Sequence, residues 1–237
     1  MLEALRESVC RANRMLPAYG LVCLTWGNVS AADREQGVML IKPSGLSYDE
    51  MRPEDIVTVD FETGQAMEGA RRPSVDTWIH LEVYRAFPQI RSIVHTHSRW
   101  ATIWAQAGMA IPALGTTHAD EFLGDIPCTR AMRPEEIRTE YERNTGRVIS
   151  ETLRQREVFS RGAVLVRSHG PFAWGETPEK AVEAAVTLEE TANMAWHTML
   201  LRGDAASPIP EELLNKHFFR KHGKDSYYGQ GGGGGIT

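Results

Sequence analysis

Two histidines one residue apart close an apolar run at residues 93–97, and a third follows another apolar run at residues 164–166. Side chains alternate between the two faces of a β-strand, so His95 and His97 point the same way, roughly 6–7 Å apart along the chain. His169 comes where the later run gives way to a turn containing glycine, a usual place for functional groups on a rigid scaffold. The pattern predicts that strand ends present these imidazoles to one metal ion, as in an enzyme.

A simpler interpretation competes with this one at each position. A lone histidine in a strand is commonly a hydrogen-bonded core residue, and it is the third histidine that favours a metal site over that interpretation. A carboxylate ligand is also wanted, and Asp76 lies just before an expected helix at residues 78–87. On the residues alone, Asp76 is better explained as a helix N-cap or first-turn acid.

Composition limits the class of protein and its partners. The 237 residues are 42% hydrophobic and 24% charged, which is typical of a globular protein. A net charge of -5 argues against a nucleic-acid partner. The cysteines Cys10, Cys23 and Cys128 are odd in number and widely spaced, which fits reduced thiols. Neither a membrane-length apolar stretch nor a signal peptide is found, so a cytoplasmic location is expected.

The order of periodic segments predicts helices mixed with strands. Helices are expected at residues 2–16, 78–87, 98–107, 134–156, 178–201 and 211–222. Strands are expected at residues 21–24, 38–41, 56–59, 90–97, 162–166 and 172–174. We find no linker, so residues 1–230 are expected to form one three-layer α/β domain, with helices flanking a mostly antiparallel or mixed sheet. The glycine-rich tail, residues 231–237, is expected to be disordered.

Two short segments after expected strands have the composition of a phosphate site. Residues 26–28 and 42–45 supply small residues, backbone amides and hydroxyls, and Lys42 adds a compact positive charge. The spacing of a P-loop is absent. Since a turn that contains glycine is usually only a turn, the composition leaves both interpretations open.

Several ordered blocks together resemble the L-ribulose-5-phosphate 4-epimerases of the class II aldolase and epimerase superfamily. The blocks are residues 24–30, 41–45, 93–98, 115–120, 168–175 and 227–230. The resemblance runs from Met1 to about Gln230 and leaves out only the glycine tail. The combination is specific, although each block singly is not, and it implies a fold like that of the class II aldolases.

The resemblance implies a divalent metal, usually zinc and otherwise an ion such as Mn²⁺ or Co²⁺. The family's ligand positions match His95, His97, His169 and Asp76, which turns Asp76 from an expected cap into an expected ligand. The positions that contact the substrate phosphate match Gly27, Asn28, Ser44, Gly45 and Ser74, with Lys42 nearby. Val75 departs from the family pattern, which has a second serine before the aspartate, so a hydroxyl is lost there.

The activity that the resemblance implies is inversion at C4 of a ketopentose phosphate by cleavage and re-formation of the C3–C4 bond. The substrates would be L-ribulose 5-phosphate and D-xylulose 5-phosphate. Asp120 and Tyr228 match the proton-transfer positions, and Thr116, Glu142 and His217 match binding or orienting positions. The family forms cyclic homotetramers with active sites between subunits, so Tyr228 is expected to act on a neighbouring subunit's metal.

Two other functions remain open on the sequence. A sugar-phosphate aldolase of the same superfamily shares the histidines and phosphate segments, but it has a longer glutamate near the position of Asp76. A non-catalytic binding module of the adducin type has no reason to keep His95, His97 and His169 together. The sequence does not decide between arabinose catabolism and ascorbate or another sugar route, nor which metal is native.

Overall fold

A single six-stranded sheet organises the fold of the computed structural model, which describes residues 2–67, 71–203, 206–223 and 226. Neighbouring strands in the sheet are antiparallel and follow the order β3-β2-β1-β4-β6-β5. Their bounds are β1 (Asn28–Asp33), β2 (Val38–Ile41), β3 (Val57–Asp60), β4 (Ser92–His95), β5 (Gly162–Val166) and β6 (Gly170–Gly175). The sheet is thus of the antiparallel kind that the sequence predicts.

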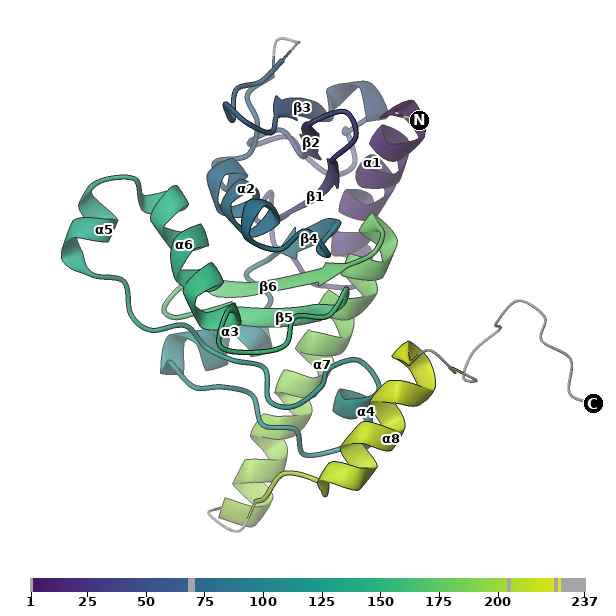
Figure 1. Ribbon diagram of the computed structural model, residues 1–237, viewed down its shortest axis with the longest axis vertical. Helices are drawn as coiled ribbons and strands as arrows, with labels where there is room; N and C mark the ends of the chain where they lie inside the picture. The colour runs from purple at the N-terminus through teal and green to yellow at the C-terminus, as the bar shows by residue number, and fades with distance from the viewer. Residues whose placement is uncertain (1, 68–70, 204–205, 224–225, 227–237) are drawn as a thin grey trace, which may run out of the picture.

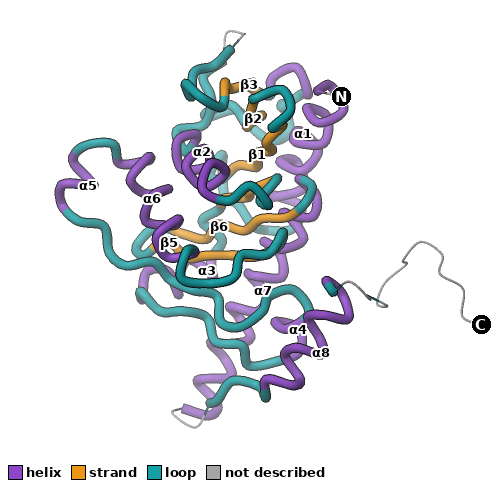
Figure 2. Tube along the Cα trace, in the orientation of Figure 1, coloured by secondary structure: helices purple, strands orange, loops and turns teal. Residues whose placement is uncertain are grey.

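Helices cover both faces of this sheet, which gives three layers (Figure 1). One layer consists of α1 (Leu2–Ala18), α3 (Arg99–Ala107) and the long α7 (Pro178–Arg202). The opposite layer consists of α2 (Thr77–Ala86) and α6 (Tyr141–Leu153). The remaining helices are η1 (Pro53–Asp55), α4 (Thr116–Ala119), α5 (Pro134–Arg138) and α8 (Glu211–His222). Long loops join them around the sheet, as Figure 2 shows.

Alternation along the strands divides the core into two apolar clusters, one on each face of the sheet. In β6, Ala173 packs with α1, α3 and α7, whereas Phe172 and Trp174 pack with α2 and α6. In β4, Val94 and Ile93 separate in the same way. The two-residue period of a strand requires this separation when both faces are covered.

The prediction of a strand at residues 21–24 is wrong. The strand in this part of the chain is β1, which begins at Asn28, four residues after Leu24. Leu24 has a left-handed φ of 52° and Gly27 a φ of 100°, so the chain turns before it enters the sheet. A Cβ on Gly27 would lie 2.8 Å from the carbonyl oxygen of His95. The residue before β1 approaches β4 this closely because it is a glycine.

Two other expected elements differ in their bounds. The helix expected at residues 134–156 is two helices, α5 and α6, separated at Thr139 and Glu140. The strand expected to reach His97 ends at His95, because the last pair between β4 and β1 joins His95 to Asn28. The last helix, α8, has the predicted bounds.

α3 begins after a serine that occupies the N-cap position without capping the helix. Ser98 is the N-cap residue, but its side chain makes no capping hydrogen bond in the described segment. The carboxylate of Glu189 on α7 instead accepts hydrogen bonds from the backbone N–H groups of Trp100, at 2.8 Å, and Ala101, at 3.0 Å. These two hydrogen bonds connect α3 to α7.

The predicted glycine tail, residues 231–237, lies outside the described residues. Among the helices that the structure does describe, none is long and apolar enough to span a membrane.

Candidate metal centre and substrate pocket

The three histidines that the sequence singles out converge at one end of the sheet. His95 is the last residue of β4, His97 lies in the loop before α3, and His169 lies in the turn between β5 and β6. One ligand nitrogen from each lies within 4.8 Å of the other two. Because β6 is the neighbour of β4, the turn that carries His169 is placed beside the end of β4.

Gly170 allows that turn to come so close. A Cβ at this position would lie 2.7 Å from the carbonyl oxygen of Thr96. Ser168, one residue before His169, adopts a left-handed φ of 62°. In the sequence, the residue that indicates this close approach is therefore the glycine that follows His169. Any larger residue there would push the turn away from β4.

The spacing of the imidazoles fits a divalent cation. The Nε2 atoms of His95 and His97 are 3.2 Å apart, close to the separation of about 3.3 Å between two nitrogen ligands of a tetrahedral zinc ion. The Nδ1 atom of His95 lies 3.0 Å from the carbonyl oxygen of Pro171, which only accepts, so Nδ1 carries the proton and Nε2 keeps its lone pair. His169 has a buried Nδ1 without a hydrogen-bond partner among the described residues.

Two of these imidazoles, His97 and His169, are also held in the neutral form that binds metals. Burial, together with the nearby His95 and His97, lowers the pKa of His169 to about 3. Burial is likewise the main cause that lowers the pKa of His97, followed by the effect of His95. At neutral pH these side chains therefore offer lone pairs rather than positive charges.

Asp76 lies at the N-cap position of α2, but its side chain does not cap the helix within the described segment. Its Oδ2 atom accepts a hydrogen bond of 2.7 Å from Asn28 Nδ2 and one of 3.4 Å from Ser74. Burial works to raise the pKa of Asp76, but the imidazoles around it, led by His95, lower it overall. Asp76 is not one of the three residues whose donor atoms cluster most tightly, yet it lines the same pocket.

A pocket of about 400 Å³ opens beside the histidines. The side chains and backbone expected to bind substrate line it at eight positions: Gly27, Asn28, Lys42, Ser44, Gly45, Ser74, Val75 and Glu142. Two segments are held side by side here, since Ser74 N–H donates to the Lys42 carbonyl oxygen at 3.0 Å and Ser44 N–H donates to that of Arg72 at 3.0 Å. Residues 42–45 and 74–76 therefore form one wall.

Lys42 supplies the positive charge of this pocket. Its side chain is only 2% exposed, and Nζ donates to the Pro43 carbonyl oxygen at 3.2 Å and lies 4.9 Å from the centre of the Tyr48 ring. None of the ion pairs in the described part of the chain involves Lys42. Burial lowers its pKa to about 8. A buried ammonium without a carboxylate partner suits an anionic ligand.

Tyr141 lines the pocket although the sequence does not indicate it as a site residue, and Trp26 lines it as part of the segment 26–28. The centre of the Tyr141 ring is 6.4 Å from that of His169, and the Trp26 ring is 6.5 Å from that of His97. Tyr141 is the first residue of α6. The sequence does not indicate that a helix begins at Tyr141, because residues 134–156 are predicted to form one continuous helix.

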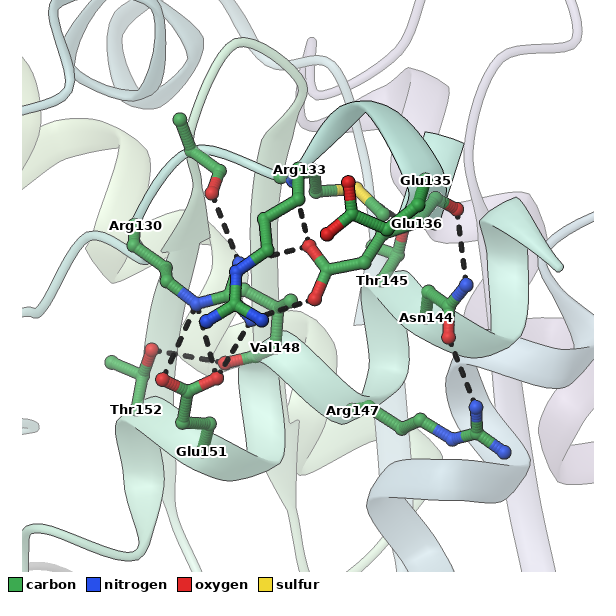
Figure 3. Close-up of polar contacts among 12 residues, drawn as sticks. Arg130, Arg133, Glu135, Glu136, Asn144, Thr145, Arg147, Val148, Glu151 and Thr152 are labelled. Carbon is green, nitrogen blue, oxygen red and sulfur yellow. Dashed lines mark hydrogen bonds and ion pairs between the residues drawn. The ribbon is translucent and has the colours of Figure 1, made fainter. Parts of the chain in front are cut away.

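An ionic network joins the loop after residue 129 to α5 and to the C-terminal end of α6. Figure 3 shows Arg130 between Glu136 of α5 and Glu151 of α6, at 2.8 Å and 2.9 Å. The backbone N–H of Arg133 also donates to Glu136, at 2.7 Å. Mainly because of Arg130, the pKa of Glu136 falls to about 2. The loop after residue 129 is thus attached to both helices.

Three other expected site residues lie together in a second cluster. Asp120, which follows α4, accepts hydrogen bonds of 2.9 Å from both His217 and Arg220 of α8. Burial works to raise the pKa of Asp120, but these two hydrogen bonds lower it overall, so the carboxylate is ionised at neutral pH. Thr116 begins α4. Figure 1 shows α4 and α8 next to each other, in the lower half of the view.

Within the described residues, Asp120, Thr116 and His217 are not part of the lining of the histidine pocket. The structure therefore brings together the predicted metal and phosphate residues with Glu142, but not the predicted proton-transfer cluster. Tyr228, the other predicted proton-transfer residue, lies outside the described residues.

Comparison with known protein families agrees with this fold and this site. Residues 7–196 match the family model of the class II aldolase and adducin N-terminal domain. The chain belongs to this family.

Two individual relatives match the chain over nearly its whole length. The chain is 55% identical over 231 residues to L-ribulose-5-phosphate 4-epimerase UlaF of Salmonella paratyphi C (strain RKS4594), which covers 97% of this chain and 100% of the relative. A second enzyme of that name, from Salmonella choleraesuis (strain SC-B67), is equally similar.

Solved structures show the same fold. An L-fuculose 1-phosphate aldolase superposes with a TM-score of 0.74 at 26% identity, over 90% of this chain and 94% of the other. The L-fuculose-1-phosphate aldolase of Thermus thermophilus gives 0.67 at 30% identity, over 86% and 100%. The predicted family and fold class are confirmed.

Proposed function

We propose that this chain is a metal-dependent L-ribulose-5-phosphate 4-epimerase, which interconverts L-ribulose 5-phosphate and D-xylulose 5-phosphate. One observation carries the proposal: the three histidines converge within 4.8 Å beside a pocket that holds the buried ammonium of Lys42. The 55% identity to enzymes named for this activity supports the same substrate.

The metal would be held by His95, His97 and His169, with Asp76 as the fourth ligand. We propose zinc, with Mn²⁺ or Co²⁺ as substitutes, because three imidazoles and a carboxylate are a normal zinc set. When bound, the cation supplies Lewis-acid stabilisation of the negative charge that develops on the ketose oxygens as the C3–C4 bond breaks. Asn28 keeps the carboxylate of Asp76 in place by its 2.7 Å hydrogen bond.

The phosphate group would lie against the wall formed by residues 42–45 and 74–76. Lys42 supplies a charge, Ser44 and Ser74 supply hydroxyls, and backbone N–H groups supply the remaining donors. Gly27, Asn28 and Gly45 complete this end of the pocket. At the other end, Glu142 reaches the pocket from the first turn of α6.

Two proton transfers at the C4 oxygen are assigned to Asp120 and Tyr228. One group takes the proton of the C4 hydroxyl as the C3–C4 bond breaks, which releases glycolaldehyde phosphate. The aldehyde turns over, the bond forms again on its other face, and the second group returns a proton to the new C4 oxygen. Asp120 is available to accept a proton because its lowered pKa keeps the carboxylate ionised at neutral pH. His217 holds its carboxylate, and Thr116 is assigned to the same side of the site.

A neighbouring subunit would have to bring these groups to the metal. Asp120, Thr116 and His217 are not part of the lining of their own chain's pocket among the described residues. A cyclic homotetramer with active sites between subunits satisfies this requirement, and we propose that assembly. We further propose that residues 1–230 act as one domain, and that the enzyme works in the cytoplasm in pentose catabolism such as that of arabinose.

An aldolase that releases dihydroxyacetone phosphate is the second candidate, since L-fuculose 1-phosphate aldolases share the fold. The two reactions share bond cleavage beside a metal-held carbonyl. We favour the epimerase because the acidic residue here is the short Asp76, which suits a ligand that stays in place, and because of the identity to named epimerases.

The test is to incubate the metal-loaded protein with L-ribulose 5-phosphate and to follow D-xylulose 5-phosphate in a coupled assay. We expect inversion that stops when a chelator removes the cation and returns when zinc is restored. Cleavage of a ketose 1-phosphate to dihydroxyacetone phosphate, without conversion of L-ribulose 5-phosphate to D-xylulose 5-phosphate, would assign the chain to the aldolases. No conversion in either direction would overturn the proposal.

A further inference from the structure

The imidazole of His95 is contacted by two consecutive residues of the neighbouring strand. In the pairing of β4 with β6, His95 stands opposite Phe172. The two rings are stacked, with centroids 4.2 Å apart and planes inclined by 15°. The carbonyl oxygen of Pro171 accepts the Nδ1–H hydrogen bond at 3.0 Å. One residue thus holds an edge of the imidazole, and the next covers its face.

Phe172 is itself fixed on other sides. Its side chain is 2% exposed, and the His80 ring packs against it in a T-shaped arrangement, with centroids 5.9 Å apart and planes at 65°. His80 is fully buried, and its Nδ1 lies 2.7 Å from Ser30 Oγ, which in turn lies 2.8 Å from Tyr84 Oη. This buried network limits the movement of the Phe172 ring.

A single hydrogen bond at Nδ1 does not determine the plane of the ring. The torsion between Cβ and the imidazole ring is broad in histidine, so the ring can rock about its hydrogen bond. A flat aromatic face parallel to the imidazole removes that freedom. With both contacts present, Nε2 of His95 and Nε2 of His97 face the same point, and the two atoms are 3.2 Å apart.

We propose that Phe172 is a positioning residue of the metal centre: its ring fixes the plane of His95 so that the imidazole meets the cation without reorganisation. This inference rests on the proposed metal site. Phe172 does not touch the reacting atoms, and its stacked contact is with His95; its ring also lies in a T-shaped arrangement with that of His169, with centroids 6.2 Å apart. An aliphatic side chain would fill the same space but would not hold the imidazole plane.

The experiment compares Phe172→Leu with a matched control, Trp174→Leu. Trp174 lies two residues along β6, is 3% exposed, packs in the same apolar cluster and makes no described ring contact with His95, His97 or His169. The affinity for Zn²⁺ is measured by chelator competition, and the visible absorption spectrum of the Co²⁺-loaded protein reports ligand geometry. Both are measured at a temperature where circular dichroism shows each variant folded.

We expect Phe172→Leu to bind Zn²⁺ roughly 10- to 100-fold more weakly than the parent, the usual loss when a partner of a metal ligand is removed. Its Co²⁺ spectrum should change, whereas Trp174→Leu should keep the parent's affinity and spectrum. Phe172→Tyr, which keeps the aromatic face, should bind more tightly than Phe172→Leu. If Phe172→Leu does not fold, Phe172→Met serves in its place, with the same expectation.

Parent affinity and spectrum in Phe172→Leu would overturn the inference, and so would equal losses in Phe172→Leu and Trp174→Leu, which would indicate a general effect of packing. In both cases the parent still binds Zn²⁺, so the proposed function stands. A parent protein that binds no divalent cation would overturn the proposed function and this inference together.

Discussion

Lys42 is a buried cation whose contribution depends on its protonation state. Burial lowers its pKa to about 8, so the positive charge is present below that pH and is lost as the pH rises through it. Phosphate binding needs the charged form. We therefore expect the KM for L-ribulose 5-phosphate to rise above this pKa while kcat changes little, because substrate and transition state lose the same interaction.

The measurement is KM at pH values on both sides of that pKa, for the parent and for Lys42→Met. The variant should have a raised KM below this pKa, where the parent carries the charge, and no inflection from this group. A parent KM that stays level across the range, or an unchanged inflection in Lys42→Met, would remove Lys42 from phosphate recognition.

Val75 is the residue at which the pocket departs from the pattern of its family. Its side chain is 68% exposed and lines the pocket. A serine here would add one donor, and a hydrogen bond to a charged group contributes about 1.5–3 kcal/mol, with exposure favouring the lower end. We expect Val75→Ser to lower KM by about tenfold without changing the rate of the chemical step.

Val75→Ala is the matched control, since it shortens the side chain without adding a donor and should leave KM unchanged. Steady-state kinetics with L-ribulose 5-phosphate and with unphosphorylated L-ribulose checks this prediction. Loss of turnover in Val75→Ser, or a preference of the parent for the unphosphorylated sugar, would show that the phosphate assignment is wrong.

At this scale the sequence predicts the chemistry better than the contacts. The H-x-H spacing and the third histidine place three imidazoles correctly because both strands and the glycine turn can be recognised in the sequence. The bond between Asn28 and Asp76 is not predictable in this way, since it joins residues 48 positions apart. Tyr141 reaches the pocket only because the expected helix is interrupted before it.

Among the elements, helices with clear end signals match their predicted bounds closely. In α7, Thr177 caps the helix through a 3.2 Å hydrogen bond from Lys180 N–H, with Pro178 at the first position. The strand expected at residues 21–24 fails because local apolar composition does not detect the turn at Leu24 and Gly27. β1 is missed because its small residues have weak strand propensity, and pairing with β2 and β4 overrides that propensity.

The turn between β5 and β6 is the element on which the metal centre depends most. A Cβ on Gly170 would come within 2.7 Å of the Thr96 carbonyl oxygen, so Gly170→Ala must move the turn that carries His169. We expect this substitution to cost about 1–3 kcal/mol of folding free energy and to weaken Zn²⁺ binding. Denaturant unfolding and chelator competition measure the two effects.

Gly115→Ala is the control for this substitution, because a Cβ there would meet nothing within 4 Å. It should keep the metal affinity of the parent. If Gly170→Ala binds Zn²⁺ as tightly as Gly115→Ala does, the close approach of the turn to β4 does not determine the geometry of the centre.

For the whole molecule, the proposed tetramer requires that two subunits share each active site. The variant His97→Ala should lose the metal but keep Asp120 and Tyr228, and Tyr228→Phe should keep the metal and lose epimerisation. Subunits mixed under exchange conditions would then form some sites with both functions intact. We expect the mixture to be more active than the sum of the two variants measured separately.

Exchange is confirmed by co-purification of a tagged variant with an untagged one. The control mixes two variants that are defective on the same side, His97→Ala and His95→Ala, which should gain nothing. Mixed subunits that exchange fully and stay inactive would show that the metal and the proton-transfer groups come from one chain.

Anomalous diffraction from crystals of the zinc-loaded protein tests most directly whether the end of the sheet holds a catalytic divalent cation. We expect an anomalous peak about 2.0–2.1 Å from one nitrogen each of His95, His97 and His169, with a carboxylate oxygen of Asp76 as the fourth ligand. Full-occupancy zinc elsewhere, with these imidazoles bound to no metal, would contradict the proposed metal site.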